Sequence, residues 1–135
     1  MTINRADASD AEELAELNRQ LIEDEQHPNP MTRAELAERM IRWMEEGYTC
    51  YVARSGGVTA GYCLFRDDGK HYYLRQLFVA RGQRRRGIAT ALMDWMYANV
   101  WSGKPVRLDV FAHNEEAVAF YRGYGFRVAV LRMEK

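Results

Sequence analysis

Hydrophobic residues near the start of the chain recur at the spacing of an α-helix. Those that share one helical face are Leu14, Leu17, Leu21 and Ile22. Ser9–Glu12, just before them, has the composition of a capping box. The prolines of His27–Pro30 end this helix because proline lacks the amide proton that a helix needs. A second capping box, Thr32–Glu35, opens another apolar stripe, so the pattern predicts two consecutive helices.

The pattern then changes to residues that favour strands. Three such segments, separated by glycine-containing turns, are 48–54, 58–65 and 72–80. They predict an antiparallel meander, and Thr2–Ala6 could supply a short strand before it. Further on, the pattern predicts a helix from Ile88, a strand over Val106–Phe111, a helix capped by Asn114 and a last strand over Phe126–Met133.

The order of these elements indicates the fold class. The strand–helix–strand unit Tyr72–Phe111 predicts a parallel pair with a right-handed crossover, whereas the hairpins before it are antiparallel. We therefore expect an α/β (α+β) fold with a mixed, mostly antiparallel sheet of six to seven strands and helices on both faces. No internal repeat or linker is visible, so residues 1–135 are expected to form a single domain.

Composition narrows the class of protein. Hydrophobic residues make up 47% and charged residues 28% of the chain, which is typical of a globular protein and not of a disordered one. The two cysteines, Cys50 and Cys63, form no C-x-x-C motif and suit the core of a protein in a reducing compartment. With no apolar run of about 18 residues and an N-terminus unlike a signal peptide, we expect a cytoplasmic protein. No metal-ligand spacing is present.

Charge is distributed unevenly along a chain whose net charge is zero. The segment from Asp7 to Glu46 holds twelve acidic and four basic residues, a balance of −8, and the remainder carries +8. Two interpretations stay open. The predicted helices could simply have solvated acidic faces, or the two regions could bind partners of opposite charge.

The most informative segment is Leu77–Thr90, where a hydrophobic strand leads through a basic loop into a helix. The first amides of a helix have no partner inside it, and together with the helix dipole they bind anions. Gly87 and Ala89 let the backbone approach a ligand closely. The flanking arginines are Arg84, Arg85 and Arg86. These features predict a pyrophosphate site, whereas the motifs of nucleotide triphosphatases and dinucleotide-binding folds are missing.

The motif Arg84-x-x-Gly87-x-Ala89, after Leu77–Val79, resembles the R/Q-x-x-G-x-G/A motif of the GNAT superfamily of N-acetyltransferases. The resemblance implies acetyl-CoA as co-substrate, bound where the strands 72–80 and 106–111 splay apart. It also implies that backbone groups near Phe78 and Val79 pair with pantetheine. The cofactor-binding residues implied are Phe78, Val79, Arg84, Arg85, Arg86, Gly87, Ile88, Ala89, Thr90 and Asn114.

A second motif, Asn114–Phe126, is similar to the family's N-x-x-A-x-x-[FL]-Y-x-x-x-G-F. It implies that Asn114 caps a helix and reaches the cofactor, and that Tyr121 lies near the cofactor sulfur. A phenol there could protonate the leaving thiolate, which makes Tyr121 the candidate catalytic residue. The alternative is that Tyr121 is a core aromatic residue beside Phe120.

The chain departs from the family where relatives often carry a carboxylate on the splayed strand. Arg75 and Gln76 stand there instead, so the general base stays open. The candidates are Asp109, Glu23, Asp24, Glu25, His27 and water. Arg81 replaces a proline that is common after the strand. Little sequence follows Phe126, so the last hairpin is expected to be short or completed by another subunit in a homodimer.

Taken with the resemblance, these features predict direct transfer of an acetyl group from acetyl-CoA to a primary amine in a ternary complex. The acceptor would be a small molecule or a peptide, and the −8 balance of the first two helices favours a cationic one. Two alternatives remain. One is a non-catalytic acyl-CoA-binding or sensor module, and the other is a nucleic-acid-binding domain that uses Arg81–Arg86, which zero net charge disfavours.

Overall fold

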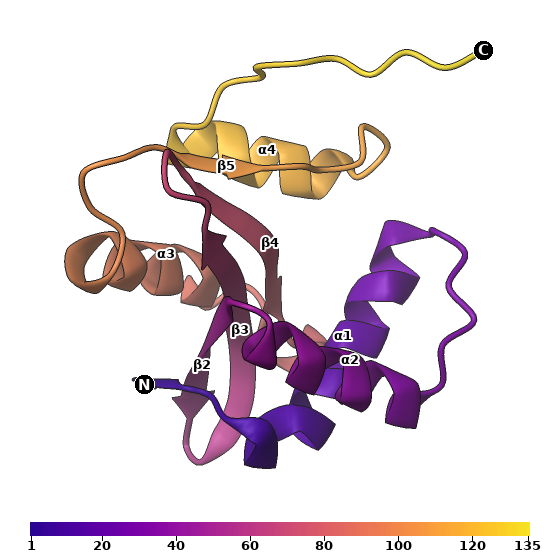
Figure 1. Cartoon of the computed structure of the whole chain (residues 1–135), viewed down its shortest axis with the longest axis vertical. Helices are drawn as coiled ribbons and strands as arrows, with labels where there is room; N and C mark the ends of the chain where they lie inside the picture. The colour runs from indigo at the N-terminus through magenta and orange to yellow at the C-terminus, as the bar shows by residue number, and fades with distance from the viewer.

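The computed structural model describes all 135 residues and contains five strands and four α-helices (Figure 1). The strands are β1 (Thr2–Arg5), β2 (Tyr48–Ser55), β3 (Val58–Asp67), β4 (Tyr72–Val79) and β5 (Val106–Leu108). The helices are α1 (Ala11–Glu25), α2 (Arg33–Glu45), α3 (Ile88–Asn99) and α4 (Glu115–Tyr124), with short 3-10 turns at Ala8–Asp10 and Arg81–Gln83. No helix has both the length and the hydrophobicity needed to cross a membrane.

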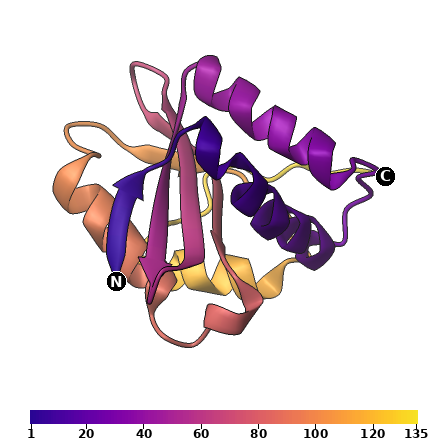
Figure 2. The same ribbon diagram turned by 90° about the horizontal axis from the view of Figure 1, so that it is seen from below.

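The five strands form one sheet in the order β1-β2-β3-β4-β5. The first three pairings are antiparallel and the last, between β4 and β5, is parallel. Helices α1 and α2 cover one face, and α3 and α4 lie on the other (Figure 2). Two hydrophobic clusters fill these layers, one around Leu14, Met40 and Tyr62 and the other around Leu74 and Met93. The predicted mixed α/β fold class is confirmed.

The two N-terminal helices begin at capping residues, but only one of them begins as predicted. At α2, Glu35 N donates to Thr32 Oγ1 (3.2 Å) and Thr32 N donates to Glu35 Oε1 (2.9 Å), as the sequence indicates. Before α1, the capping box is formed by Asp7 and Asp10 rather than by Ser9 and Glu12. The reason is that a 3-10 turn precedes the helix, which moves the cap toward the N-terminus.

The sheet has five strands where six to seven were predicted. Phe126–Met133 forms no strand, and its segment runs away from the sheet (Figure 1). Two features explain this. The N–H of Phe126 donates to the carbonyl of Tyr121 (2.9 Å), which holds the start of the segment at the end of α4. In addition, β5 spans only Val106–Leu108, shorter than the predicted Val106–Phe111, so a further strand would have a very short edge to pair with.

A β-bulge in β4 separates its paired half from its free half. Phe65 of β3 pairs with Leu74 and Leu64 pairs with Gln76, so Arg75 is an extra residue without a partner. Pairing of β4 with β5 ends at Leu74, immediately before the bulge. Because a bulge bends its strand and increases its twist, it accounts for the divergence of β4 from β5. The gap predicted between these strands therefore opens at Arg75.

Candidate active site

The loop between β4 and α3 presents a continuous row of free amides. Gly87 is the residue before α3 and adopts a left-handed conformation (φ 71°), as does Arg85 (φ 64°). None of the backbone amides from Arg84 to Thr90 donates a hydrogen bond to another group of the protein. Successive free amides at a helix N-terminus form a concave site for anions. All the residues predicted for the pyrophosphate therefore lie together in one short loop.

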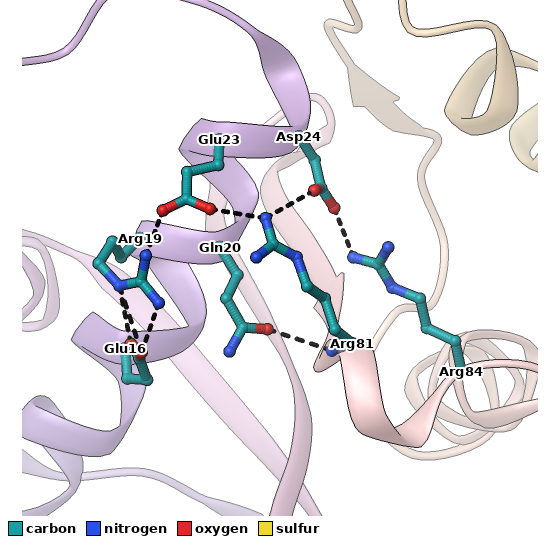
Figure 3. A network of polar contacts seen from close by, with 7 residues as sticks. All are labelled: Glu16, Arg19, Gln20, Glu23, Asp24, Arg81 and Arg84. Atoms are coloured by element: carbon teal, nitrogen blue, oxygen red, sulfur yellow. Dashed lines mark hydrogen bonds and ion pairs between the residues drawn. The ribbon is translucent and has the colours of Figure 1, made fainter.

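The arginines of this loop have different partners. The guanidinium of Arg84 turns back across β4, where Nη2 lies 2.5 Å from Asp24 Oδ2 and Nε donates to the carbonyl of Val79 (3.2 Å). Arg81 pairs with Glu23 (2.8 Å) and Asp24 (3.1 Å), so two acidic residues of α1 lie against the loop (Figure 3). Arg86 contacts only Gln83 within the loop, and Arg85 makes no side-chain hydrogen bond. Arg85 and Arg86 are the arginines that remain available to a ligand.

The half of β4 after the bulge, which does not pair with β5, directs some of its backbone groups into the gap. Successive residues of a strand direct their N–H and C=O groups to opposite sides, which decides which residues face the gap. The N–H of Ala80 donates to the carbonyl of Ala60 (2.8 Å). The carbonyl oxygen of Phe78 also faces β3, since it would lie 2.7 Å from a Cβ atom added to Gly61. Phe78 and Ala80 therefore direct their backbone groups toward β3. The backbone groups of Val79 point the other way, into the gap. Of the two residues predicted to pair with pantetheine, Val79 has the suitable orientation and Phe78 does not.

Tyr121, on α4, lies on the same side of the sheet as α3. Its ring packs against Phe120 (5.4 Å between centroids) and Phe126 (5.6 Å), in the cluster that also contains Leu77 and Leu108. Leu77 is on β4 and Leu108 on β5, so the cluster on which Tyr121 packs reaches both diverging strands. Its hydroxyl has no hydrogen-bond partner, and burial raises the pKa of Tyr121 far above its ordinary value. The phenol is therefore protonated at neutral pH and free to donate.

Asn114 occupies the position predicted for it at the start of α4. Its side-chain oxygen accepts a hydrogen bond from the N–H of Ala117 (3.3 Å), which caps the helix. Capping engages the oxygen, while the amide NH₂ group stays available to a ligand. The capping role is thus visible, and contact with the cofactor stays a prediction.

A polar cavity of about 270 Å³ lies on the opposite face, between β4 and the helices α1 and α2. It is lined by Ile22, Glu25, His27, Asn29, Arg39, Trp43, Tyr73, Arg75, Gln76 and Phe111. The bulge explains why both Arg75 and Gln76 line it, since the extra residue interrupts the alternation of side chains. Sequence reasoning missed Arg39 and Tyr73, because nothing in their spacing shows that α2 and β4 face one another here.

The candidates for the general base lie in three different places in the structure. Glu23 and Asp24 face the phosphate loop and are paired with its arginines. Asp109 accepts a hydrogen bond from the hydroxyl of Tyr73 (3.0 Å) and is exposed. Glu25 and His27 line the polar cavity. The carboxylate of Glu25 has no hydrogen bond or ion pair, although His113 Nε2 lies 2.5 Å from the backbone carbonyl oxygen, and burial raises the pKa of Glu25. Glu25 is therefore the candidate carboxylate whose basicity the fold increases.

The regional charge balance does not describe this cavity. The acidic surplus of the N-terminal helices includes Glu23 and Asp24, which point to the phosphate loop instead. Glu25 is the one carboxylate that lines the cavity, together with the guanidinium groups of Arg39 and Arg75. The argument for a cationic acceptor, which rested on the −8 balance, therefore loses its structural basis.

Comparisons with known proteins agree with this fold. The chain resembles a protein from Bacillus halodurans, solved as a mutant, with a TM-score of 0.85, 22% identity and coverage of 100% of this chain and 98% of that one. For a ribosomal-protein-alanine N-acetyltransferase from Brucella melitensis, the TM-score is 0.73 and the identity 20%. The match covers 98% of this chain and 100% of that one. For a predicted acetyltransferase from Clostridium acetobutylicum, solved with acetyl-CoA, the TM-score is 0.70 and the identity 18%. The match covers 99% of this chain and 94% of that one. These likenesses show the fold.

Similarity at the level of sequence comes from the family and not from individual proteins. No curated protein matches the chain. A model of the acetyltransferase (GNAT) family matches residues 14–126, which include the phosphate loop, both diverging strands and Tyr121. The chain belongs to the GNAT family of acetyltransferases.

Proposed function

We propose that this protein transfers an acetyl group from acetyl-CoA to the primary amine of an acceptor, directly and in a ternary complex. The observation that carries the proposal is the row of free amides from Arg84 to Thr90, which begins where the free half of β4 ends. The row suits a pyrophosphate, and the outward N–H of Val79, whose carbonyl already accepts from Arg84, suits a carbonyl of an extended amide chain. Together they fit the two polar parts of coenzyme A.

The residues on either side of the gap suit the two proton movements of the reaction. Acetyl-CoA supplies a thioester whose carbonyl carbon is open to attack by a neutral amine. As the new C–N bond forms and the C–S bond breaks, the amine must lose a proton and the sulfur gains negative charge. Glu25 takes the proton on the acceptor side. Tyr121, by its position in the second motif, donates a hydrogen bond to the leaving sulfur.

Two further functions fit the structure less well. A non-catalytic acyl-CoA sensor would need neither an unpaired carboxylate in the polar cavity nor a free phenol at the gap, and the chain has both. A nucleic-acid-binding domain would need its arginines exposed to phosphates. Arg81 and Arg84 are paired with acidic residues of α1, whose charge would repel a polyanion.

Thermal unfolding with acetyl-CoA, ADP or a short oligonucleotide tests the binding half of the proposal. A ligand at about 100 times its dissociation constant stabilises by about 2.7 kcal/mol, which raises the midpoint by about 5–10 °C in a domain of this size. We expect the larger shift with acetyl-CoA. Release of free thiol in the presence of a panel of amines then tests transfer. A shift with the oligonucleotide alone would overturn the proposal.

A further inference from the structure

Two arginines converge on the polar cavity from different elements. Arg39 projects from α2, and Arg75 projects from the bulge of β4. Both guanidinium groups lie over the ring of Trp43, at 4.3 Å for Arg39 and 4.6 Å for Arg75. Contact with the same indole brings both charges to the lining of the cavity. The bulge matters here, since regular alternation would direct Arg75 away from the side that Gln76 faces.

Neither arginine has a carboxylate partner. Arg39 donates to the side-chain oxygen of the buried Asn18 (3.0 Å), and Arg75 donates to the hydroxyl of Tyr48 (3.2 Å). The arginines that do lie within 4.0 Å of a carboxylate are Arg19, Arg54, Arg66, Arg81 and Arg84. The bonds to Asn18 and Tyr48 use only one of the N–H donors of each guanidinium, so donors of both groups are left over.

The positive charges of Arg39 and Arg75 repel one another, although contact with Trp43 and the charge of Glu25 offset part of this repulsion. Burial lowers the pKa of Arg39, and the positive charge of Arg75 lowers it further. An anion between the two guanidinium groups would relieve that repulsion and accept their unused N–H groups. A carboxylate suits the planar fork of a guanidinium, whose donors remain free at its edge when its face stacks on an aromatic ring.

We infer that the acetyl acceptor is a small amine that also carries a carboxylate, with the carboxylate bound by Arg39 and Arg75 and the amine directed toward Glu25. This inference rests on the proposed function and identifies the substrate class of the same site. Glu25 lines the same cavity as the arginines, so one small molecule can reach both. The cavity, of about 270 Å³, has room for an amino-acid-like molecule.

The test is a set of matched acceptors assayed with the full chain. Glycine, leucine, methionine, phenylalanine and glutamine are each compared with their carboxamides, and putrescine represents the cationic amines. The measured quantity is the ratio of kcat/KM for the acid to that for its amide. The two amines of a pair differ in basicity, and comparing this ratio between protein variants cancels that difference.

We expect Arg75→Gln to lower the acid-to-amide ratio by about ten- to a hundredfold, the effect of losing a hydrogen bond between charged groups. Arg39→Lys keeps the charge and lowers the ratio by a smaller factor, and it avoids burying Asn18 without a charged partner. Arg42→Gln is the control, since Arg42 lies on the same helix outside the cavity and changes the charge equally. It should leave the ratio unchanged.

A binding measurement makes the outcome independent of turnover. Calorimetric titration of the same amino acids into the CoA-bound protein should give binding that Arg75→Gln weakens and Arg42→Gln does not. If carboxylates bind in this way but no amine is acetylated, the proposed function fails and the inference about the cavity stands. If amides or putrescine are the better acceptors and the ratio is the same in Arg75→Gln, the inference is overturned while acetyl transfer stands.

Discussion

Arg84 Nη2 lies 2.5 Å from Asp24 Oδ2, and this contact ties the phosphate loop to the last turn of α1. Burial of Asp24 opposes its ionisation, but hydrogen bonds from Arg84 and Arg81 outweigh this effect and lower its pKa. The carboxylate is therefore charged at neutral pH and stands beside the site proposed for a pyrophosphate. Glu25, the next residue, lines the polar cavity. One helix end thus contacts both halves of the site.

The first prediction concerns the competition between Asp24 and phosphate for Arg84. Asp24→Asn should raise the affinity for coenzyme A by about three- to tenfold, because it removes a negative charge near the pyrophosphate and frees a guanidinium. Isothermal titration calorimetry measures this directly. Glu12→Gln makes the same change of charge at the other end of α1 and should have no effect. Equal or weaker binding in Asp24→Asn would show that the contact supports the loop rather than competing for it.

The second prediction uses two glycines with the same backbone conformation. Gly87 (φ 71°) and Gly103 (φ 78°) both have open space where a Cβ would lie. Alanine at either position should destabilise the fold by about 1–2 kcal/mol, the cost of a left-handed residue with a side chain. Only Gly87→Ala should also weaken coenzyme A binding, since its Cβ lies among the free amides. Thermal unfolding and calorimetry on both variants separate the two effects, and equal affinities would exclude a phosphate site at Gly87.

The sequence correctly predicted the features that depend on residues close together in the chain. Proline, glycine and capping residues indicated the ends of α1, α2 and α3, and the free amides before α3 follow from the segment Leu77–Thr90 alone. The last strand was wrongly predicted because Phe126–Met133 has strand-forming composition, whereas forming a strand requires a partner edge. No local pattern reports the length of β5, which sets that edge.

The polar cavity was beyond sequence reasoning because it depends on pairings between distant residues. Arg75 reaches it through a bulge that only the register of β3 against β4 reveals. Arg39 and Arg75 both lie over Trp43 because α2 packs on the face of the sheet from which Arg75 projects. Counting charges along the chain treated Glu23, Asp24 and Glu25 as one acidic group. In the fold the first two face the loop and the third faces the cavity.

The third prediction tests Tyr121 as a catalytic residue. Its hydroxyl makes no hydrogen bond within the protein, so Tyr121→Phe should leave the unfolding midpoint and the affinity for acetyl-CoA nearly unchanged. We expect kcat to fall by about ten- to a hundredfold, because the leaving sulfur loses a hydrogen bond. Tyr124→Phe is the control, since the hydroxyl of Tyr124 donates to Asp94 (2.6 Å). It should lower stability slightly and leave kcat intact. An unaltered kcat in Tyr121→Phe would make Tyr121 a packing residue.

The fourth prediction concerns Glu25, where catalysis and stability should move in opposite directions. Burial raises the pKa of Glu25 in the folded protein, so the unfolded chain gives up this proton at lower pH. Above the pKa of the unfolded chain, ionisation of Glu25 therefore favours unfolding. The stability that protonated Glu25 contributes is lost as pH rises through the folded-state pKa. Glu25→Gln should therefore raise the unfolding midpoint at pH 7. Below about pH 4, where the carboxyl is protonated in both states, it should have little effect.

The same substitution should reduce kcat by about a hundredfold, because it removes the base that deprotonates the amine. Since the base acts only when ionised, the wild-type rate should rise with pH through the pKa of Glu25, and this rise should be absent in Glu25→Gln. Glu23→Gln is the control: it weakens the ion pair with Arg81 on the neighbouring turn and should leave the pH profile unchanged. If Glu25→Gln is more stable at pH 7 and keeps the wild-type rate from pH 5 to pH 9, the carboxylate is buried without being the base. His27, which lines the same cavity, or water would then deprotonate the amine.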